Sequence, residues 1–295
     1  MALQQLEKVM IAGNYAKRSI VTYTREIRFF AVYFPEVKPS DWQESHVLDY
    51  MHYLKKTLGA SYSKHKMFAQ SIAFFFRHVL KRPFDTPSKL YPRREFKLPC
   101  VLTQEEIKQL LNACRSLKQR CLIELFYGSG LRLEELQYLQ MTDIEAAQTR
   151  IRVNHGKGKR QRYTILPKQV LTNLRKYYLK EEVKPKVYLF EGQSPGKPMH
   201  SRSIQHSVRM AYHKAGLSHK ERKVHALRHS FATHLLDNGV DIFTIKELLG
   251  HSKIETTMVY LHLQTSKRNM LISPLDTLYK PSNEIALINK HSKLL

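Results

Sequence analysis

The chain has 295 residues, of which 42% are hydrophobic and 25% are charged, and its formal net charge at pH 7 is +24. This apolar content is typical of globular proteins and excludes a disordered or fibrous chain. The excess of lysine and arginine indicates a polyanionic partner, either nucleic acid or an acidic membrane surface.

Residues 1–82 have the pattern of a helical domain. Apolar side chains recur at helical spacing in three segments, 19–34, 40–58 and 61–80. We expect Ser40 and Asp41 to cap the second helix, because both residue types accept hydrogen bonds from a first helical turn. The three phenylalanines Phe74 to Phe76 could stack on bases. We favour a buried core, since stacking platforms usually lie on sheets or in grooves.

The segment 83–100 separates the predicted domains. It contains four prolines and little periodicity. Because proline cannot continue a helix and also restricts the residue before it, we predict an inter-domain linker here. Its basic side chains either follow a DNA backbone or are simply solvated, and the sequence favours neither interpretation. They are Lys89, Arg93, Arg94 and Lys97.

Residues 101–280 form the second predicted domain. The segment from Thr103 to Glu106 has the pattern of a capping box at the start of a helix. Segments 149–154 and 161–166 alternate as strands do and flank a glycine-containing turn. Further helices are expected over 117–127, 131–140, 167–180, 201–215, 225–238, 241–249 and 254–263. The predicted fold class is mainly α with a small antiparallel β-sheet.

The densest group of polar side chains is the segment His225-Ala-Leu-Arg228-His229. Residues three apart share one face of a helix, so His225 and Arg228 can address one ligand. His225 and His229 also have a zinc-like spacing, but the glutamate of a zinc-protease helix is missing, which disfavours a metal. A guanidinium offers a bidentate fork to phosphate oxygens, and an imidazole exchanges a proton near neutral pH. The pair therefore suits a phosphate better.

Three further candidates are ambiguous in isolation. Arg132 lies three residues before Glu135, and this spacing alone favours a surface ion pair within one helix. Lys157 lies between two glycines at the tip of the predicted hairpin, where a flexible ammonium can enter a groove. Its motif lacks the spacing of a nucleotide-binding P-loop. Tyr260 is one of 16 tyrosines and alone would be interpreted as a core or surface residue.

Four motifs follow one another in the second domain: GLRLEEL, GKGKRQR, HALRHSFATHLL and LGHSKIETTMVYLH. In this order they resemble the catalytic domain of the tyrosine recombinases, the phage integrase family, and most of all the Xer-type and integron-type integrases. The resemblance covers residues 103–265. Residues 1–82 are similar in kind to the family's N-terminal core-binding domain. The resemblance implies a two-domain clamp around DNA, with residues 101–280 as the catalytic domain.

The resemblance also implies a set of catalytic residues. These are Arg132, Lys157, His225, Arg228, His251 and Tyr260, with Glu135 in support. Tyr260 is the implied nucleophile, forming a 3′-phosphotyrosyl bond and freeing a 5′-hydroxyl. The two arginines and His251 stabilise charge on the phosphate oxygens, and Lys157 protonates the leaving 5′-oxygen. His225 assists proton transfer or positions the phosphate. No metal and no cofactor is implied.

The implied function is site-specific DNA recombination or integration by metal-independent transesterification. The implied partners are double-stranded DNA with inverted repeats and further copies of the chain, as a homotetramer on two duplexes. Residues 281–295 form a tail that either packs on a neighbouring protomer or is disordered. The chain lacks a signal-peptide stretch and an apolar run of about 18 residues. We therefore expect no membrane partner and a cytoplasmic, nucleoid-associated location. Reduced thiols are expected at Cys100, Cys114 and Cys121.

Three other functions explain part of the pattern. A DNA-binding transcriptional regulator would use residues 228–250 as a helix-turn-helix, but it leaves Arg132, Lys157 and Tyr260 unexplained. A type IB topoisomerase would use the same chemistry on one duplex as a monomer. A nucleoid architectural protein would explain the charge and form no covalent adduct. The substitution Tyr260→Phe separates these functions, because a recombinase would still bind DNA and lose strand cleavage.

Overall fold

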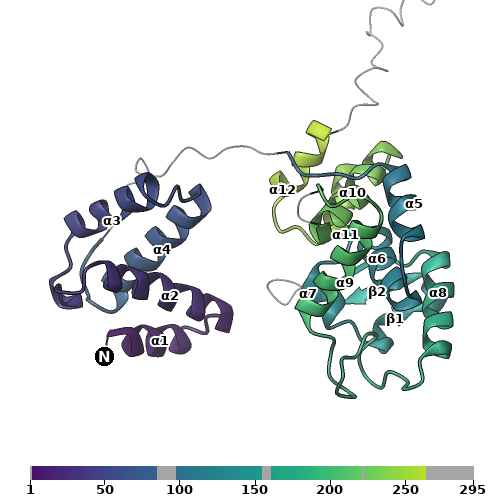
Figure 1. Ribbon diagram of the computed structural model, residues 1–295, viewed down its shortest axis with the longest axis horizontal. Coiled ribbons are helices and arrows are strands. Elements are labelled where there is room, and N and C mark those ends of the chain that lie inside the picture. The colour runs from purple at the N-terminus through teal and green to yellow at the C-terminus, as the bar shows by residue number, and fades with distance from the viewer. Residues whose placement is uncertain (1, 85–97, 155–160, 221–222, 264–295) are drawn as a thin grey trace, which may run out of the picture. The chain divides into compact units, whose positions relative to one another are not determined.

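The computed structural model describes residues 2–84, 98–154, 161–220 and 223–263. The chain forms two compact units, Met1–Phe96 and Lys97–Leu295, and the division falls within the proline-rich segment 83–100 (Figure 1). The four basic side chains of that segment lie outside the described residues. Among the helices that the structure describes, none is long and apolar enough to cross a membrane.

The first unit consists of helices packed around an aromatic core. Its helices are α1 (Ala2–Ala12), α2 (Lys17–Tyr33), α3 (Glu44–Lys56) and α4 (Tyr62–His78). Phe30 lies at the centre, with its ring centroid 4.7 Å from that of Trp42 and 5.5 Å from that of Phe68. Phe75 and Phe76 are buried, and Phe74 packs against the same core. The core interpretation of the phenylalanine run is therefore confirmed.

The expected cap of α3 is wrong. Ser40 and Asp41 belong to a separate 3-10 turn, Pro39–Asp41, because Pro39 fits the first position of a helical turn. The buried Trp42 then takes an extended backbone conformation, which ends that turn. Gln43 is the N-cap of α3, and its backbone N–H donates to Nδ1 of His46 at 3.0 Å.

The second unit is mainly helical, as predicted, and contains one small sheet. Its helices are α5 (Gln104–Asn112), α6 (Leu117–Gly128), α7 (Leu133–Gln137), α8 (Lys168–Lys180), α9 (Ser201–Lys214), α10 (Lys223–Asp237), α11 (Ile242–Leu249) and α12 (Glu255–Met258). The capping box is present, since the N–H of Glu106 donates to Oγ1 of Thr103 and the N–H of Thr103 donates to the Glu106 carboxylate. The helix expected over 254–263 is α12 followed by a 3-10 turn, Val259–Leu263.

The sheet has three antiparallel strands in the order β1-β2-β3. They are β1 (Ile144–Glu145), β2 (Arg150–Val153) and β3 (Arg162–Ile165). The two longer strands confirm the predicted pair, with Arg150 opposite Ile165 and Val153 opposite Arg162. The sequence did not indicate β1, because two residues are too few to show alternation.

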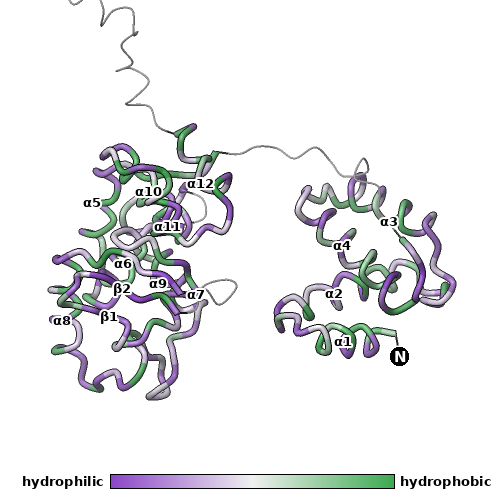
Figure 2. The backbone as a smooth tube through the Cα atoms, turned by 180° about the vertical axis from the view of Figure 1, so that it is seen from behind, coloured by the Kyte–Doolittle hydropathy of each residue, from purple (hydrophilic) through white to green (hydrophobic). Residues whose placement is uncertain are grey.

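The core of the second unit surrounds α6. This helix packs against α8, α9 and α10, and its residues from Cys121 to Phe126 are all buried. Figure 2 shows hydrophobic and hydrophilic positions alternating along the helices, as expected for helices with one buried face. A smaller cluster joins α10 and α11 to Tyr260. Since α11 also packs against β3 and α12, the four elements α10, α11, β3 and α12 meet in this part of the second unit.

Candidate active site

A left-handed glycine places Arg132 at the start of α7. Gly130 has φ +61°, and a Cβ there would lie 2.4 Å from Cδ1 of Phe231, so another side chain is excluded on both counts. The turn makes Arg132 the N-cap of α7 and shortens the helix that was expected from residue 131. The backbone N–H of Arg132 donates to Oε2 of Glu135 at 2.8 Å, and its Nη1 donates to Oε1 at 2.7 Å.

Glu135 is a buried carboxylate that forms ion pairs with three arginines. Its side chain is only 1% exposed, so the alternative of a surface ion pair with Arg132 is wrong. Arg162 of β3 donates to both carboxylate oxygens, and Nη1 of Arg228 lies 3.7 Å from Oε2. Burial alone would raise the pKa of Glu135. The hydrogen bonds and charge of Arg162, together with the charges of Arg132 and Arg228, outweigh it and lower the pKa to about 2.

Arg228 is fixed from two sides by backbone carbonyls. Its Nη1 donates to the carbonyl of Gly130, before α7, and its Nη2 donates to the carbonyl of Leu249 at 2.6 Å, at the end of α11. The side chain is buried within α10. Burial and the neighbouring arginines lower its pKa to about 9, which leaves the guanidinium charged at neutral pH. Arg228 therefore presents a fixed positive charge beside Arg132.

His251 follows α11 and faces Arg228. Its Nε2 lies 3.3 Å from Nη2 of Arg228, and its Nδ1 lies 2.9 Å from Oγ1 of Thr257. Because a guanidinium can only donate, Nε2 must accept, so Nδ1 carries the proton and donates to Thr257. Burial, followed by the charges of the three arginines, lowers the pKa of His251 to about 3. The imidazole is therefore neutral at pH 7.

Tyr260 is buried in the small hydrophobic cluster that it forms with α10 and α11. The residue is 2% exposed and packs among side chains of α10 and α11. Its hydroxyl oxygen lies 2.9 Å from Nδ1 of His229, one position after Arg228. Burial raises the pKa of Tyr260 and outweighs the opposing charges of Arg228 and Arg132. The hydroxyl is therefore protonated at neutral pH in this arrangement.

Two arginines thus share one buried carboxylate, and one of them contacts a neutral imidazole. Residues 100–267 match the model of the phage integrase family, and residues 2–86 match the family's N-terminal SAM-like domain. The chain belongs to the phage integrase family. It is a tyrosine-type site-specific recombinase, an enzyme that breaks and rejoins DNA. The alternatives of a regulator and an architectural protein do not account for this match.

Curated relatives extend over nearly the whole recombinase. Tyrosine recombinase XerD of Rickettsia bellii is 30% identical over 299 residues, covering 92% of this chain and 97% of the relative. Tyrosine recombinase XerA of Thermococcus kodakarensis is 30% identical over 262 residues, covering 88% and 89%. Among solved structures, XerH bound to difH in a pre-cleavage complex has a TM-score of 0.72 at 23% identity, covering 91% of this chain and 83% of that chain. At this identity the structural likeness concerns the fold.

His225 and Lys157 are the two remaining predicted catalytic residues of the recombinase. His225 is exposed in the first turn of α10, and its ring centroid lies 6.5 Å from that of His229. Lys157 lies outside the described residues, between the end of β2 at Val153 and the start of β3 at Arg162. The direct contacts of the site therefore join Arg132, Glu135, Arg228 and His251.

Sequence reasoning missed two residues that contact this site. His229 was considered only as a zinc ligand, and the described residues hold no group of three or more metal-ligating side chains. Arg162 ends the GKGKRQR motif, but the sequence did not indicate a role for it, because one more arginine in a basic segment carries no distinct signal. The alternation of strand residues could have identified it, since Arg162 and Thr164 point to the same face, and Thr164 is buried.

Proposed function

We propose that the recombinase cuts and rejoins DNA through a 3′-phosphotyrosyl intermediate, without a metal. The Tyr260 hydroxyl loses its proton with the assistance of His225, and its oxygen attacks the scissile phosphorus. The bond to the 5′-oxygen breaks, and that oxygen leaves with a proton supplied by Lys157. A 5′-hydroxyl of the partner strand then attacks the phosphotyrosine and releases Tyr260. Two transesterifications conserve the phosphodiester bond, so no high-energy cofactor is needed.

One observation carries this proposal: Arg132 and Arg228 are held by one buried carboxylate beside a hydrogen-bonded tyrosine. Two fixed guanidinium groups stabilise the charge that develops on the phosphate oxygens. In this role His251 is a neutral imidazole, because its pKa is about 3. His225, exposed at the start of α10, assists proton transfer or positions the phosphate.

The substrate we propose is double-stranded DNA with inverted repeats, bound by a tetramer on two duplexes in the cytoplasmic nucleoid. Structures related in fold include XerH bound to palindromic difH and a lambda integrase dimer bound to a core site. In this proposal residues 1–82 form the core-binding domain, 83–100 the linker and 101–280 the catalytic domain. The tail 281–295, outside the described residues, packs on a neighbouring protomer.

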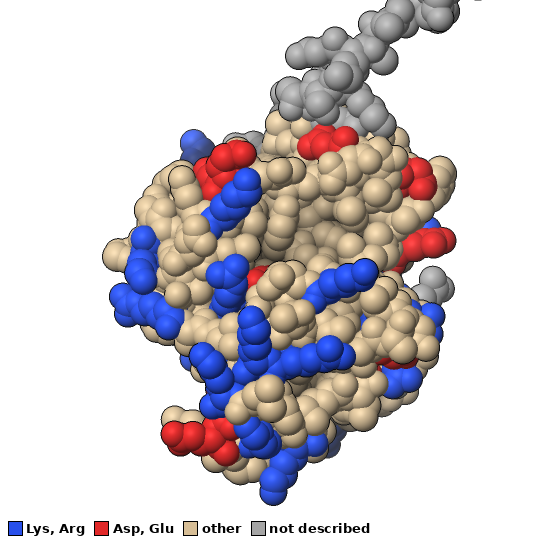
Figure 3. All heavy atoms as spheres, turned by 90° about the vertical axis from the view of Figure 1, so that its right-hand side faces the viewer, with Lys and Arg blue, Asp and Glu red and all other residues tan. Residues whose placement is uncertain are grey.

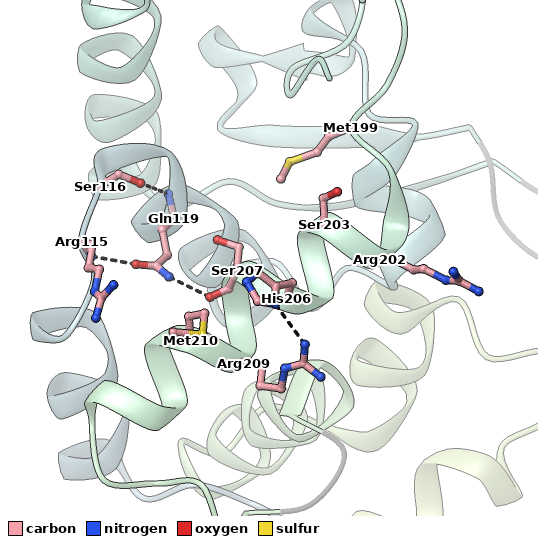
Figure 4. Close-up of a pocket in the computed structure, with 10 residues that line it drawn as sticks. All are labelled: Arg115, Ser116, Gln119, Met199, Arg202, Ser203, His206, Ser207, Arg209 and Met210. Carbon is pink, nitrogen blue, oxygen red and sulfur yellow. Dashed lines mark hydrogen bonds between the residues drawn. The ribbon is translucent and has the colours of Figure 1, made fainter. Parts of the chain in front are cut away.

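A basic hollow along α9 is our candidate for a duplex contact. It has a volume of about 660 Å³ and lies between α9 and the start of α6 (Figure 4). Arg115, Arg202 and Arg209 contribute to its lining, and Nη2 of Arg209 lies 3.0 Å from Nδ1 of His206. A concave surface with several arginines and few acids attracts phosphates. On the face shown in Figure 3, lysine and arginine side chains gather over the lower half.

Covalent-adduct capture tests the proposal. Wild type and Tyr260→Phe are expressed with candidate flanking DNA and lysed in SDS, and the DNA ends that stay attached to protein are sequenced. We expect adducts at one sequence from the wild type and none from Tyr260→Phe. The matched control is Tyr127→Phe, since the Tyr127 hydroxyl also lies 2.9 Å from a histidine Nδ1, that of His234. Scattered adducts would favour a topoisomerase, and no wild-type adduct, even with partner proteins added, would overturn the proposal.

A further inference from the structure

Arg162 makes three hydrogen bonds near the site. Its Nη1 donates to Oε1 of Glu135 at 2.7 Å and its Nη2 to Oε2 at 2.8 Å, which forms a bidentate pair. Its Nε donates to the carbonyl of Leu248 at 2.9 Å. The side chain is only 10% exposed. Arg162 thus links β3, α7 and the end of α11, three elements that meet at the site.

The bidentate pair between Arg162 and Glu135 determines which N–H groups of Arg132 remain available for a ligand. A guanidinium has five N–H groups. Within the described residues, Nη1 of Arg132 donates once to Glu135 and Nη2 donates once to the carbonyl of Gly250 at 3.1 Å. Without Arg162, the Glu135 carboxylate could rotate into a bidentate pair with Arg132 or Arg228. That pair would occupy N–H groups which a phosphate needs.

Gly250 provides a second, independent observation. It ends α11 with φ +63°, and a Cβ there would lie 2.7 Å from Cδ of Arg162 and 3.0 Å from its Nε. The glycine therefore leaves room for the Arg162 side chain to cross the end of α11. Because Arg132 binds the carbonyl of the same glycine, the segment leading to His251 is held between two arginines.

We propose that Arg162 is a positioning residue for strand cleavage, which fixes Glu135 and the end of α11 so that Arg132 and Arg228 meet the scissile phosphate in one orientation. The inference rests on the proposed function, since it requires that those arginines bind the phosphate. Arg162 itself donates to protein acceptors and acts through Glu135. A lysine at this position would keep the positive charge but lose the planar fork, so it cannot hold both carboxylate oxygens in the same way.

The test compares Arg162→Lys and Arg162→Gln with the wild type, using the DNA site identified by adduct capture. Single-turnover cleavage at saturating DNA, DNA affinity at fixed salt and thermal unfolding are measured for each. Small misplacements of catalytic groups cost up to about 100-fold in rate. We expect Arg162→Lys to cleave about 10-fold more slowly and Arg162→Gln about 100-fold more slowly, with DNA affinity unchanged. The matched control is Arg150→Gln, an arginine of the adjacent strand whose ion pair with Glu145 is partly exposed.

A pH profile distinguishes positioning from a merely structural role. Arg162 lowers the pKa of Glu135, so its loss should move the acid limb of the cleavage rate to higher pH. In the Glu135→Gln background that limb should disappear, and Arg162→Lys should then cost little further rate. Wild-type rates at saturating DNA in both variants, or rate losses that only follow the folded fraction, would overturn the inference. Failure of the wild type to cleave would instead count against the proposed function.

Discussion

Nδ1 of His229 and the hydroxyl oxygen of Tyr260 lie 2.9 Å apart, so the nucleophile we propose is hydrogen-bonded to the residue that follows Arg228. The bond fixes the direction of a tyrosine that is only 2% exposed. Because α10 carries both His229 and Arg228, one helix orients the tyrosine and presents an arginine.

His229→Ala should slow cleavage without weakening DNA binding. The bond orients the nucleophile, and small misplacements of reacting groups cost up to about 100-fold in rate, so we expect a roughly 10- to 100-fold slower single-turnover rate. His234→Ala removes the equivalent partner of Tyr127 and is the matched control. Equal rates for wild type and His229→Ala at saturating DNA would contradict a positioning role for this histidine.

Glu135 should control acid stability. Its folded pKa of about 2 lies below the unfolded value of 4.5. Its stabilising contribution is therefore present above pH 4.5 and is lost as the pH falls through 2. The difference corresponds to roughly 3 kcal/mol. Chemical unfolding of wild type and Glu135→Gln across this range should show a steeper loss of free energy in the wild type.

Glu135→Ala should be more damaging than Glu135→Gln. Both changes remove the negative charge, and uncompensated buried charge costs about 3–5 kcal/mol. Glutamine keeps an amide oxygen that accepts hydrogen bonds from the arginines, whereas alanine leaves three arginines around an empty buried site. Thermal unfolding of the two variants measures the difference. A midpoint for Glu135→Ala equal to that of the wild type would show that the arginines do not depend on the carboxylate.

His251 should make the fold sensitive to mild acid. Its folded pKa of about 3 lies below the ordinary value of 6.5, so only the unfolded chain takes up this proton as the pH falls. Stability is therefore present above pH 6.5 and declines towards pH 3. His251→Gln, which cannot be protonated, should flatten that part of the unfolding curve. An unchanged curve would mean that the imidazole charges in the folded state.

The hollow along α9 should contribute to salt-dependent binding. The slope of log K against log salt concentration is negative for duplex DNA, and each phosphate contact adds about 0.9 to its magnitude. Arg202→Gln or Arg209→Gln should therefore reduce the magnitude of the slope by about 1 and leave the cleavage rate at saturating DNA unchanged. Arg175→Gln on α8, outside the hollow, provides the comparison. An equal effect of all three would indicate a diffuse charge effect.

Local signals in the sequence predicted most of the fold. The Thr103 capping box and the alternation in β2 and β3 depend on neighbouring residues, and the structure confirms both. Burial of Glu135 could not be predicted, because it depends on Arg162, 27 residues away, and on Arg228 in α10. Nor could the bond between His229 and Tyr260, which are 31 residues apart. These contacts arise from tertiary packing, and the spacing of neighbouring residues in the sequence gives no information about it.

Tyr260 packs on α10 and α11 of its own chain, and this packing affects which subunit supplies the nucleophile. In the described arrangement the proposed nucleophile lies in the same protomer as the proposed phosphate-binding arginines, so the mechanism we propose predicts cleavage in cis. Mixing inactive Tyr260→Phe with inactive Arg228→Lys should then restore no cleavage, since no mixed pair creates a complete site. Recovered cleavage in the mixture would mean that the tyrosine is donated to a neighbour. In this arrangement, each subunit would cut only the DNA strand that its own arginines bind.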